Sequence, residues 1–267
     1  MSQTFAAPVM DNISLSGGMH VLRVTMPHEV ATQVRPGQFF HVRAAAAQSF
    51  DPLWRRALPA MQVDVLANEV AFLIMRGEPG ADWLTDRREG DTLDIFGPLG
   101  TGFVLGGNQK HLLLVAEGGA IAPLVHLADT ATGSGSGSSS MAEVVLLAGA
   151  ATLSAHLPVQ HLPEAVEVSR ATDDGTLGAV GAVSALVPPY LDWADVICAS
   201  GSLALYETLR VQLRAHRGVR TPPAQAYIWQ PFPCGIGVCR GCIVETRREP
   251  KLGCTDGPVF ALTDLVG

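Results

Sequence analysis

The chain has 267 residues, of which 48% are hydrophobic and 16% charged, and its formal net charge is −7. This length suggests two domains or slightly more, with ample apolar content for buried cores. The negative charge and the absence of a Lys/Arg cluster argue against a nucleic-acid-binding protein, because such proteins bind mainly by neutralising phosphates. No stretch approaches the roughly 18 to 20 uncharged apolar residues needed to cross a bilayer, so we expect no membrane span.

The N-terminal part of the chain is predicted to form an antiparallel β-barrel over residues 1–105. Four segments have the alternating or short apolar pattern of strands: 20–26, 38–43, 62–66 and 70–75. Pro and Gly interrupt these segments, as at Pro36-Gly37, and one short helix is expected near 81–88. Several short strands at this spacing are typical of a small barrel.

The middle of the chain is predicted to form an α/β nucleotide-binding domain with a parallel sheet over residues 106–220. Three apolar segments resemble strands buried on both faces: 111–116, 144–148 and 196–199. Helices are expected over 121–129 and 202–216, and ligands of such sheets bind at the carboxyl ends of the strands. The glycine–serine tract 133–140 is interpreted as a surface loop.

Four of the five cysteines lie within 21 residues near the end of the chain: Cys234, Cys239, Cys242 and Cys254. The spacing C-x4-C-x2-C with a further Cys is the plant-type pattern of a [2Fe–2S] cluster held by four thiolates. Gly235, Gly237 and Gly241 favour this reading, because a loop around a cluster needs residues without Cβ and N–H groups turned toward sulfur. We therefore predict a small iron–sulfur segment over 221–267, and electron transfer as the function.

Clustered cysteines can also bind zinc or form disulfides. A zinc site remains an alternative, although zinc knuckles usually contain two C-x2-C pairs. Disulfides fit less well, because residues 1–8 lack the basic and apolar regions of a secretion signal. We therefore expect a reducing, cytoplasmic location. The stretch 247–251 between Cys242 and Cys254 is predicted to be a turn joining two cluster-bearing strands.

The order of barrel, nucleotide-binding domain and cysteine segment resembles the electron-transfer subunit of class 1B dihydroorotate dehydrogenase, a ferredoxin–NADP reductase-like family. The resemblance covers nearly the whole chain. Its matching phrases are 35–39, 51–56, 90–103, 172–181 and 254–260. It implies FAD in the barrel, NAD at the second domain, and a [2Fe–2S] cluster that passes single electrons to FMN in a separate catalytic subunit.

In that family the overall reaction oxidises dihydroorotate to orotate in pyrimidine biosynthesis. The resemblance therefore implies a partner subunit that carries the dihydroorotate chemistry, within a hetero-oligomer that is a heterotetramer in the family. No catalytic residue for that chemistry is expected in this chain. The apolar residues around the cysteines are expected to contact the partner: Ile236, Val238, Val259 and Phe260.

The resemblance also implies the residues that contact the cofactors. For FAD these are Arg56, Pro59, Leu73, Ile74, Met75, Gly80 and Ala81. For the nicotinamide side they are Gly118, Gly119 and Cys198. Arg56 suits a pyrophosphate, because a guanidinium pairs with phosphate oxygens.

The chain departs from the family at several of these positions. Pro59 stands where the family has Ser, so a hydroxyl and an N–H are lost, and Ala81 lacks the hydroxyl of the family's Thr. The family's glycine-rich turn is here Ala116-Glu-Gly-Gly-Ala120, and Glu117 adds a negative charge near the expected pyrophosphate. Cys198 either lies near the nicotinamide or is a buried core thiol.

These departures leave several functions open. The chain either exchanges electrons with NAD or has lost that exchange and relays electrons from another donor. A related reductase subunit that serves hydrogenase, sulfite reductase or transhydrogenase partners is a further alternative. A scaffold that stabilises a dehydrogenase without carrying electrons is the alternative outside the enzymes.

Overall fold

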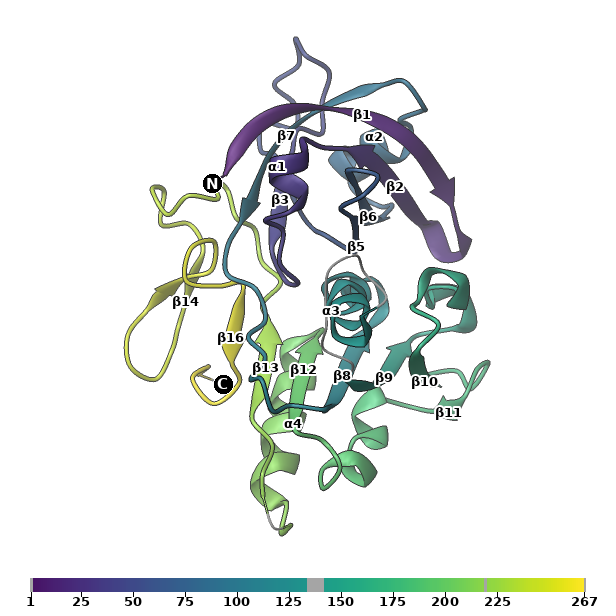
Figure 1. The fold of residues 1–267 in the computed structure, drawn as a ribbon, viewed down its shortest axis with the longest axis vertical. Helices are drawn as coiled ribbons and strands as arrows, with labels where there is room; N and C mark the ends of the chain where they lie inside the picture. Colours follow the sequence, from purple (N-terminus) through teal and green to yellow (C-terminus); the bar gives the residue numbers. More distant parts are fainter. Residues whose placement is uncertain (1, 134–141, 219, 267) are drawn as a thin grey trace.

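The computed structural model describes residues 2–133, 142–218 and 220–266, and it contains two seven-stranded sheets (Figure 1). Apart from Gly133, the glycine–serine tract expected to be a surface loop lies outside these residues. No helix within the described ranges is long and apolar enough to cross a membrane. The expected barrel and parallel-sheet architecture is confirmed.

The first sheet is antiparallel, with strand order β4-β3-β7-β1-β2-β6-β5. Its strands are β1 (Gln3–Ser14), β2 (Met19–Thr25), β3 (Phe39–Val42), β4 (Arg56–Pro59), β5 (Gln62–Asp64), β6 (Glu69–Met75) and β7 (Thr92–Leu99). The helices α1 (His28–Ala31) and α2 (Pro79–Thr85) lie in its connections. The four expected strands correspond to β2, β3, β5 and β6, and the expected short helix to α2.

Three strands of this sheet were not expected, namely β1, β4 and β7. β1 contains Pro8 and the polar residues Asp11 and Asn12, so its local pattern is weak. It forms because it pairs with β2 on one side and with β7 on the other. Pairing with neighbouring strands thus determines that this segment forms a strand, although its intrinsic β-propensity is weak.

The second sheet has strand order β11-β10-β9-β8-β12-β13-β16 and is parallel except for β16, which runs antiparallel to β13. Its strands are β8 (His111–Glu117), β9 (Glu143–Ala150), β10 (Val166–Thr172), β11 (Ala179–Val180), β12 (Val196–Ser200), β13 (Ala224–Tyr227) and β16 (Val259–Ala261). The expected strands β8, β9 and β12 are confirmed. The chain extends from β8 to β11 on one side and returns to β12 on the other, so the strand order reverses between β8 and β12.

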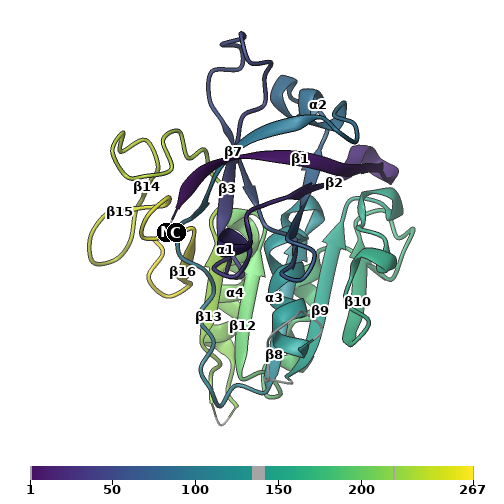
Figure 2. The ribbon, with the colours of Figure 1, turned by 45° about the horizontal axis from the view of Figure 1, so that its top comes forward.

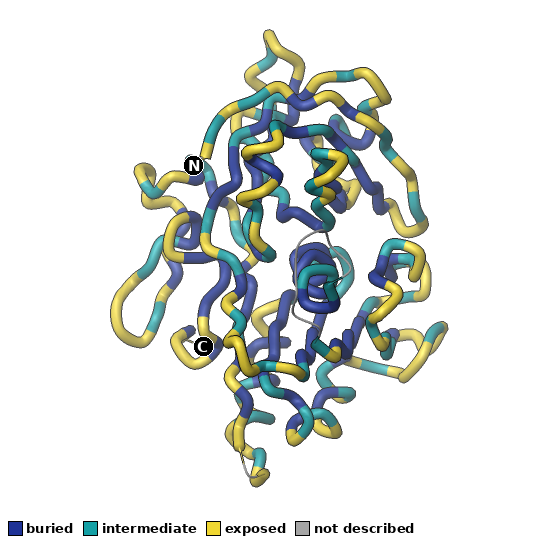
Figure 3. Tube along the Cα trace, in the orientation of Figure 1, coloured by how far each residue is buried: buried dark blue, intermediate teal, exposed yellow. Residues whose placement is uncertain are grey.

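The two helices of this half lie on opposite faces of the second sheet. α3 (Ala122–Thr132) packs between the sheet and the barrel, where Leu124 and Val125 share a core with Met19 and Leu73. α4 (Leu203–Ala215) packs on the other face, through residues such as Leu205 and Leu209. Figures 1 and 2 show this arrangement, and Figure 3 shows that α3 is largely buried. Both helices match the expected ranges closely.

The C-terminal segment is not separate from the second sheet. β13 and β16 both come from residues after 220, and they complete that sheet. The expected boundary at 221 therefore falls ahead of a strand of the same sheet, because β13 takes its hydrogen bonds from β12. A short hairpin of β14 (Ile243–Val244) and β15 (Lys251–Leu252) projects beyond it (Figure 2).

Candidate functional site

The four clustered cysteines are gathered by the hairpin and by the loop that precedes it. β14 begins directly after Cys242, and one residue, Gly253, separates the end of β15 from Cys254. Because Ile243 pairs with Leu252, the two buried cysteines Cys242 and Cys254 flank one end of the hairpin. The segment 245–250 joins the two strands and corresponds to the turn predicted over 247–251. Cys234 and Cys239 lie on the preceding loop, nearer to solvent.

Backbone N–H groups of this loop point at sulfur. The amide of Cys239 donates to Cys234 Sγ at 3.5 Å, and the amide of Gly241 donates to Cys239 Sγ at 3.4 Å. The backbone is left-handed at Gly235, with φ 69°, and at Gly237, with φ 80°, which a residue without Cβ adopts readily. N–H donors directed at sulfur stabilise thiolates, the form that binds metal.

The pKa values of Cys234 and Cys254 are shifted in opposite directions. Burial opposes ionisation of Cys234, but hydrogen bonds from the amides of Cys239, Ile236 and Val238 outweigh it and lower its pKa to about 6. Burial raises the pKa of Cys254 to about 12. A metal site that includes Cys254 must therefore displace a proton from it.

The arrangement of ligands bears on the choice between zinc and an iron–sulfur cluster. A zinc site needs three or four protein ligands around one ion, whereas each iron of a [2Fe–2S] cluster takes two cysteines. The plant-type spacing of these cysteines, C-x4-C-x2-C with a later Cys254, matches the second requirement.

A cavity of about 830 Å³ adjoins the cysteine loop, within the size range of cofactor pockets. It is lined by strands of the first sheet, by α2, by the turn that follows β8 and by the segment that leads to Cys234. Of the expected cofactor residues, six line it: Arg56, Leu73, Ile74, Met75, Ala81 and Gly119.

Arg56 provides a polar group suited to an anionic ligand. Its Nη1 pairs with Glu78, while its buried Nε has no hydrogen-bond partner in the described part of the chain. A Cβ on Gly80 would lie 2.6 Å from that Nε, so the glycine allows the guanidinium to pack against the backbone. Buried donors are normally satisfied, and a phosphate oxygen in the cavity would satisfy this one.

The remaining expected cofactor residues lie outside the cavity lining. Pro59 is buried at the end of β4, opposite Phe39. Gly118 starts the 3₁₀ turn η2 (Gly118–Ile121) that follows β8. Cys198 lies fully buried inside β12, where burial raises its pKa, and this position matches the core-thiol alternative.

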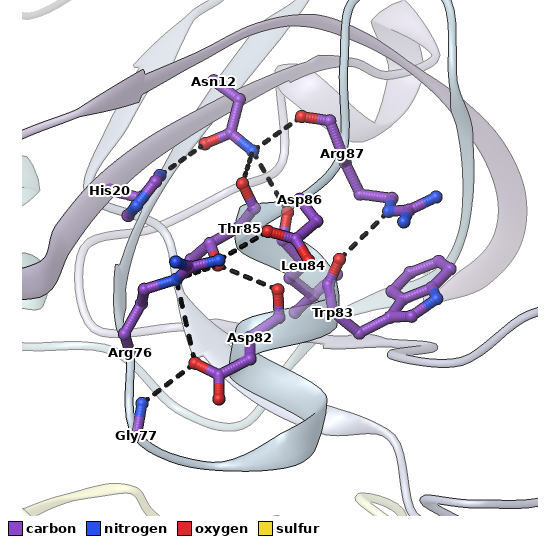
Figure 4. Close-up of polar contacts among 10 residues, drawn as sticks. All are labelled: Asn12, His20, Arg76, Gly77, Asp82, Trp83, Leu84, Thr85, Asp86 and Arg87. Carbon is purple, nitrogen blue, oxygen red and sulfur yellow. Dashed lines mark hydrogen bonds and ion pairs between the residues drawn. The ribbon is translucent and has the colours of Figure 1, made fainter.

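The helix α2, which carries Ala81 into the cavity wall, is tied to the barrel by polar contacts (Figure 4). Asn12 Nδ2 donates to the carbonyl oxygens of Leu84, Thr85 and Arg87 at 3.1, 3.0 and 2.8 Å. Arg76 Nε donates to Thr85 Oγ1 at 2.8 Å. The carbonyls at the end of a helix lack partners within the helix, so Asn12 satisfies groups that would otherwise need water.

Sequence reasoning missed two aromatic residues of the cavity, Trp229 and Phe232. Phe232 also packs with Cys242 and Cys254 and stacks on Phe39, with ring centroids 4.8 Å apart. Phe232 therefore belongs both to the cavity lining and to the apolar cluster that contains the two buried cysteines. The run Trp229-Gln-Pro-Phe-Pro233 directly before the first cysteine was the available signal.

Comparisons with known proteins point to one family. A family model described as the iron–sulfur cluster binding domain of dihydroorotate dehydrogenase B matches residues 232–266. The electron transfer subunit of dihydroorotate dehydrogenase B (NAD(+)) from Geobacillus thermodenitrificans is 31% identical over 242 residues, which cover 89% of each chain. The subunit of the same name from Bacillus cereus (strain B4264) is 31% identical over 86% of each chain.

The chain belongs to this family.

Solved structures agree on the fold of this electron-transfer subunit. A chain of NADH-dependent reduced ferredoxin–NADP oxidoreductase superposes with a TM-score of 0.82 over 100% of this chain and 91% of that chain, at 21% identity. The ferredoxin reductase of carbazole 1,9a-dioxygenase superposes with a TM-score of 0.66 over 80% of this chain and 66% of that chain, also at 21% identity. The first match extends over the cysteine segment as well as the two sheets.

The expected partner-contact residues of this family member divide into two sets. Ile236 and Val238 are 53% and 77% exposed on the cysteine loop. Val259 and Phe260, in the edge strand β16, are only 8% and 9% exposed, because their side chains pack into the apolar cores on the two faces of the second sheet. The expectation of surface contact was therefore wrong for Val259 and Phe260. Ile243, at 50% exposure, adds an apolar side chain beside the loop.

Proposed function

We propose that this chain transfers electrons between NAD and an FMN-containing catalytic dihydroorotate dehydrogenase subunit, in pyrimidine biosynthesis. In support, relatives at 31% identity are named as the electron transfer subunit of dihydroorotate dehydrogenase B (NAD(+)). The four-cysteine loop and the adjoining cavity supply places for the two redox groups that such a chain needs. We further propose a cytoplasmic location, where thiols remain reduced and available for metal.

Each group is assigned residues of this chain. Cys234, Cys239, Cys242 and Cys254 would hold the [2Fe–2S] cluster. The FAD would lie in the cavity, with Arg56 at its pyrophosphate and the apolar residues Leu73 and Ile74 against its ring system. When bound, FAD would convert between the two-electron chemistry of NAD and the one-electron chemistry of a cluster.

The observation that carries this proposal is the wall shared by the cavity and the cysteine loop. Phe232 lines the cavity and belongs to the apolar cluster that contains both buried cysteines, so a flavin and a cluster would lie near the same aromatic ring. The ring, with its stacking on Phe39, also keeps this region apolar. Short separation and a dry interior both favour electron transfer between two centres.

The exposed face of the cysteine loop supports docking of the catalytic subunit. Cys239 is exposed, and the apolar residues Ile236, Val238 and Ile243 surround this part of the loop. Apolar residues at the centre of an interface exclude water when a partner binds. We therefore propose that the partner covers this face in a hetero-oligomer and receives or delivers electrons there.

Cofactor analysis of the anaerobically purified protein tests the proposal. We expect about two irons and one flavin per chain, with flavin absorption, broad cluster bands and an EPR signal after dithionite reduction. NADH added to this protein should bleach the flavin. The native catalytic subunit should copurify with it.

Substitution of Cys198 is the matched control for substitution of a cluster cysteine. Cys254→Ser should abolish the EPR signal, whereas Cys198→Ser should leave it intact, because Cys198 lies in β12 away from the loop. Stoichiometric zinc in place of iron would contradict the cluster assignment. Cluster without flavin would favour a relay, and a protein with neither would favour a scaffold.

A further inference from the structure

The carboxyl ends of β8 and β12 form the place where the second sheet should receive a ligand. Ala116 and Ser200 are paired across these two strands, so the loops that follow them lie side by side. The strand order of the sheet reverses between β8 and β12. In open α/β sheets, ligands bind in the crevice at such a reversal, often with phosphates against backbone N–H groups.

A side chain of this chain already spans that crevice. Glu117, the last residue of β8, accepts a hydrogen bond at Oε2 from the backbone N–H of Ser202, at 2.7 Å. A Cβ on Gly201 would lie 2.7 Å from the same oxygen, so the carboxylate packs directly against the backbone of the second loop. Ser202 also caps α4, because its Oγ accepts from the amide of Leu205 at 3.2 Å. A carboxylate at this helix end is favourably placed.

The backbone amide of Gly201, next to Ser202, also has a hydrogen-bond partner within the chain. The amide of Gly201 donates to the Tyr206 hydroxyl at 2.9 Å, and that hydroxyl donates to the carbonyl oxygen of Tyr227. The two successive amides that follow β12 therefore both have partners within the chain. An incoming phosphate would have to displace one of those partners and would meet the negative charge of Glu117.

The loop that follows β8, on the other side of the crevice, has room for a ligand. Gly118, with φ 50°, has no atom within 4 Å of the position that its Cβ would occupy. The adjoining loop therefore leaves room for a ligand next to Glu117. Charge and the use of the Ser202 amide are what oppose an anion there.

We propose that Glu117 is a specificity-determining residue that competes with the pyrophosphate of a dinucleotide for the crevice between β8 and β12. This inference rests on the proposed function, in which NAD exchanges electrons with the chain. The nucleotide binds only after the carboxylate leaves Ser202, and the free energy of that displacement weakens the observed affinity. Like charges brought together at a binding site weaken it further.

Two variants separate charge from volume. Glu117→Gln keeps an oxygen that accepts from Ser202 but removes the charge, and Glu117→Gly removes both. Glu143→Gln is the matched control, because it makes the same change in net charge at the start of β9, at the amino end of the sheet. The Kd of NAD⁺ is measured by titration calorimetry on the purified protein with its cofactors, at constant ionic strength.

We expect both Glu117 variants to lower the Kd by about tenfold, and Glu143→Gln to leave it within about twofold. Unchanged or higher Kd values in both Glu117 variants overturn the inference. A lower Kd in Glu117→Gly alone assigns the effect to side-chain volume, and this too overturns the role of charge.

Flavin and cluster spectra of the same samples show that the variants are folded. They also test the proposed function separately, because the comparison of Kd values does not depend on electron transfer to the cluster. Intact spectra with unchanged Kd values would contradict the inference about Glu117 but not the proposed function.

Discussion

At the scale of single residues, Arg56 places a positive charge in the cavity wall, where it suits the pyrophosphate of FAD. Hydrogen bonds to charged groups contribute about 1.5–3 kcal/mol, a factor of roughly 10 to 100 in Kd. We expect Arg56→Ala to weaken FAD binding by that factor, measured by adding FAD to the deflavinated protein and following fluorescence quenching. Arg88→Ala is the control, because Arg88 is exposed on the same domain. Equal affinities in the two variants would remove Arg56 from the flavin site.

A second residue-scale feature is His126, which is 5% exposed in α3 and whose Nδ1 has no partner among the residues described. Burial lowers its pKa from 6.5 to about 4. Between these two values the unfolded chain binds a proton that the folded chain does not, so His126 makes the free energy of unfolding fall as the pH falls. Asp129 in the same helix acts in the opposite direction, because burial raises its pKa to about 6.

We therefore expect His126→Leu to reduce the loss of stability between pH 6.5 and 4, by up to about 3 kcal/mol. Denaturant unfolding at a series of pH values measures this difference against the parent chain. His28→Gln is the control, because His28 is exposed at the start of α1. A His126→Leu profile parallel to that of the parent would mean that His126 does not titrate as its burial requires.

At the scale of elements, α2 shows how one distant side chain holds a wall of the cavity. Asn12 comes from β1, yet it satisfies three carbonyls at the end of α2 (Figure 4). We expect Asn12→Ala to lower the free energy of unfolding by about 1–3 kcal/mol, because it leaves polar backbone groups without partners. Denaturant unfolding followed by flavin fluorescence measures the loss. Asn108→Ala, at an exposed position, should change the stability little.

Elements also show where local pattern suffices and where it does not. The segments 62–66, 111–116 and 196–199 could be identified as strands because their apolar patterns are local. β1 and β4 could not, because their local patterns are weak: β1 contains Pro8, Asp11 and Asn12, and β4 is a four-residue strand that ends at Pro59. β13 also could not be identified, and it was assigned to a separate segment although it extends the second sheet.

At the scale of the whole molecule, the apolar face of the cysteine loop predicts how the subunits assemble. Val238 is 77% exposed there. We expect Val238→Glu to weaken binding to the catalytic subunit by at least about tenfold, since a charge at the centre of an apolar contact must be desolvated. Pull-down and titration calorimetry measure the change, and the cluster EPR signal should persist. Leu66→Glu, 84% exposed on the barrel, is the control and should leave the complex intact.

The sequence by itself determined the cysteine spacing, the order of the two sheets and the departure at Glu117, because each is written in neighbouring residues. Only the tertiary structure decided what those residues meet. Phe232 at the cavity and with the buried cysteines, and Glu117 on the amide of Ser202, are contacts between segments that folding brings together. Side-chain periodicity reports which face is buried, but the partner across that face depends on how distant strands pair and how the helices pack between them.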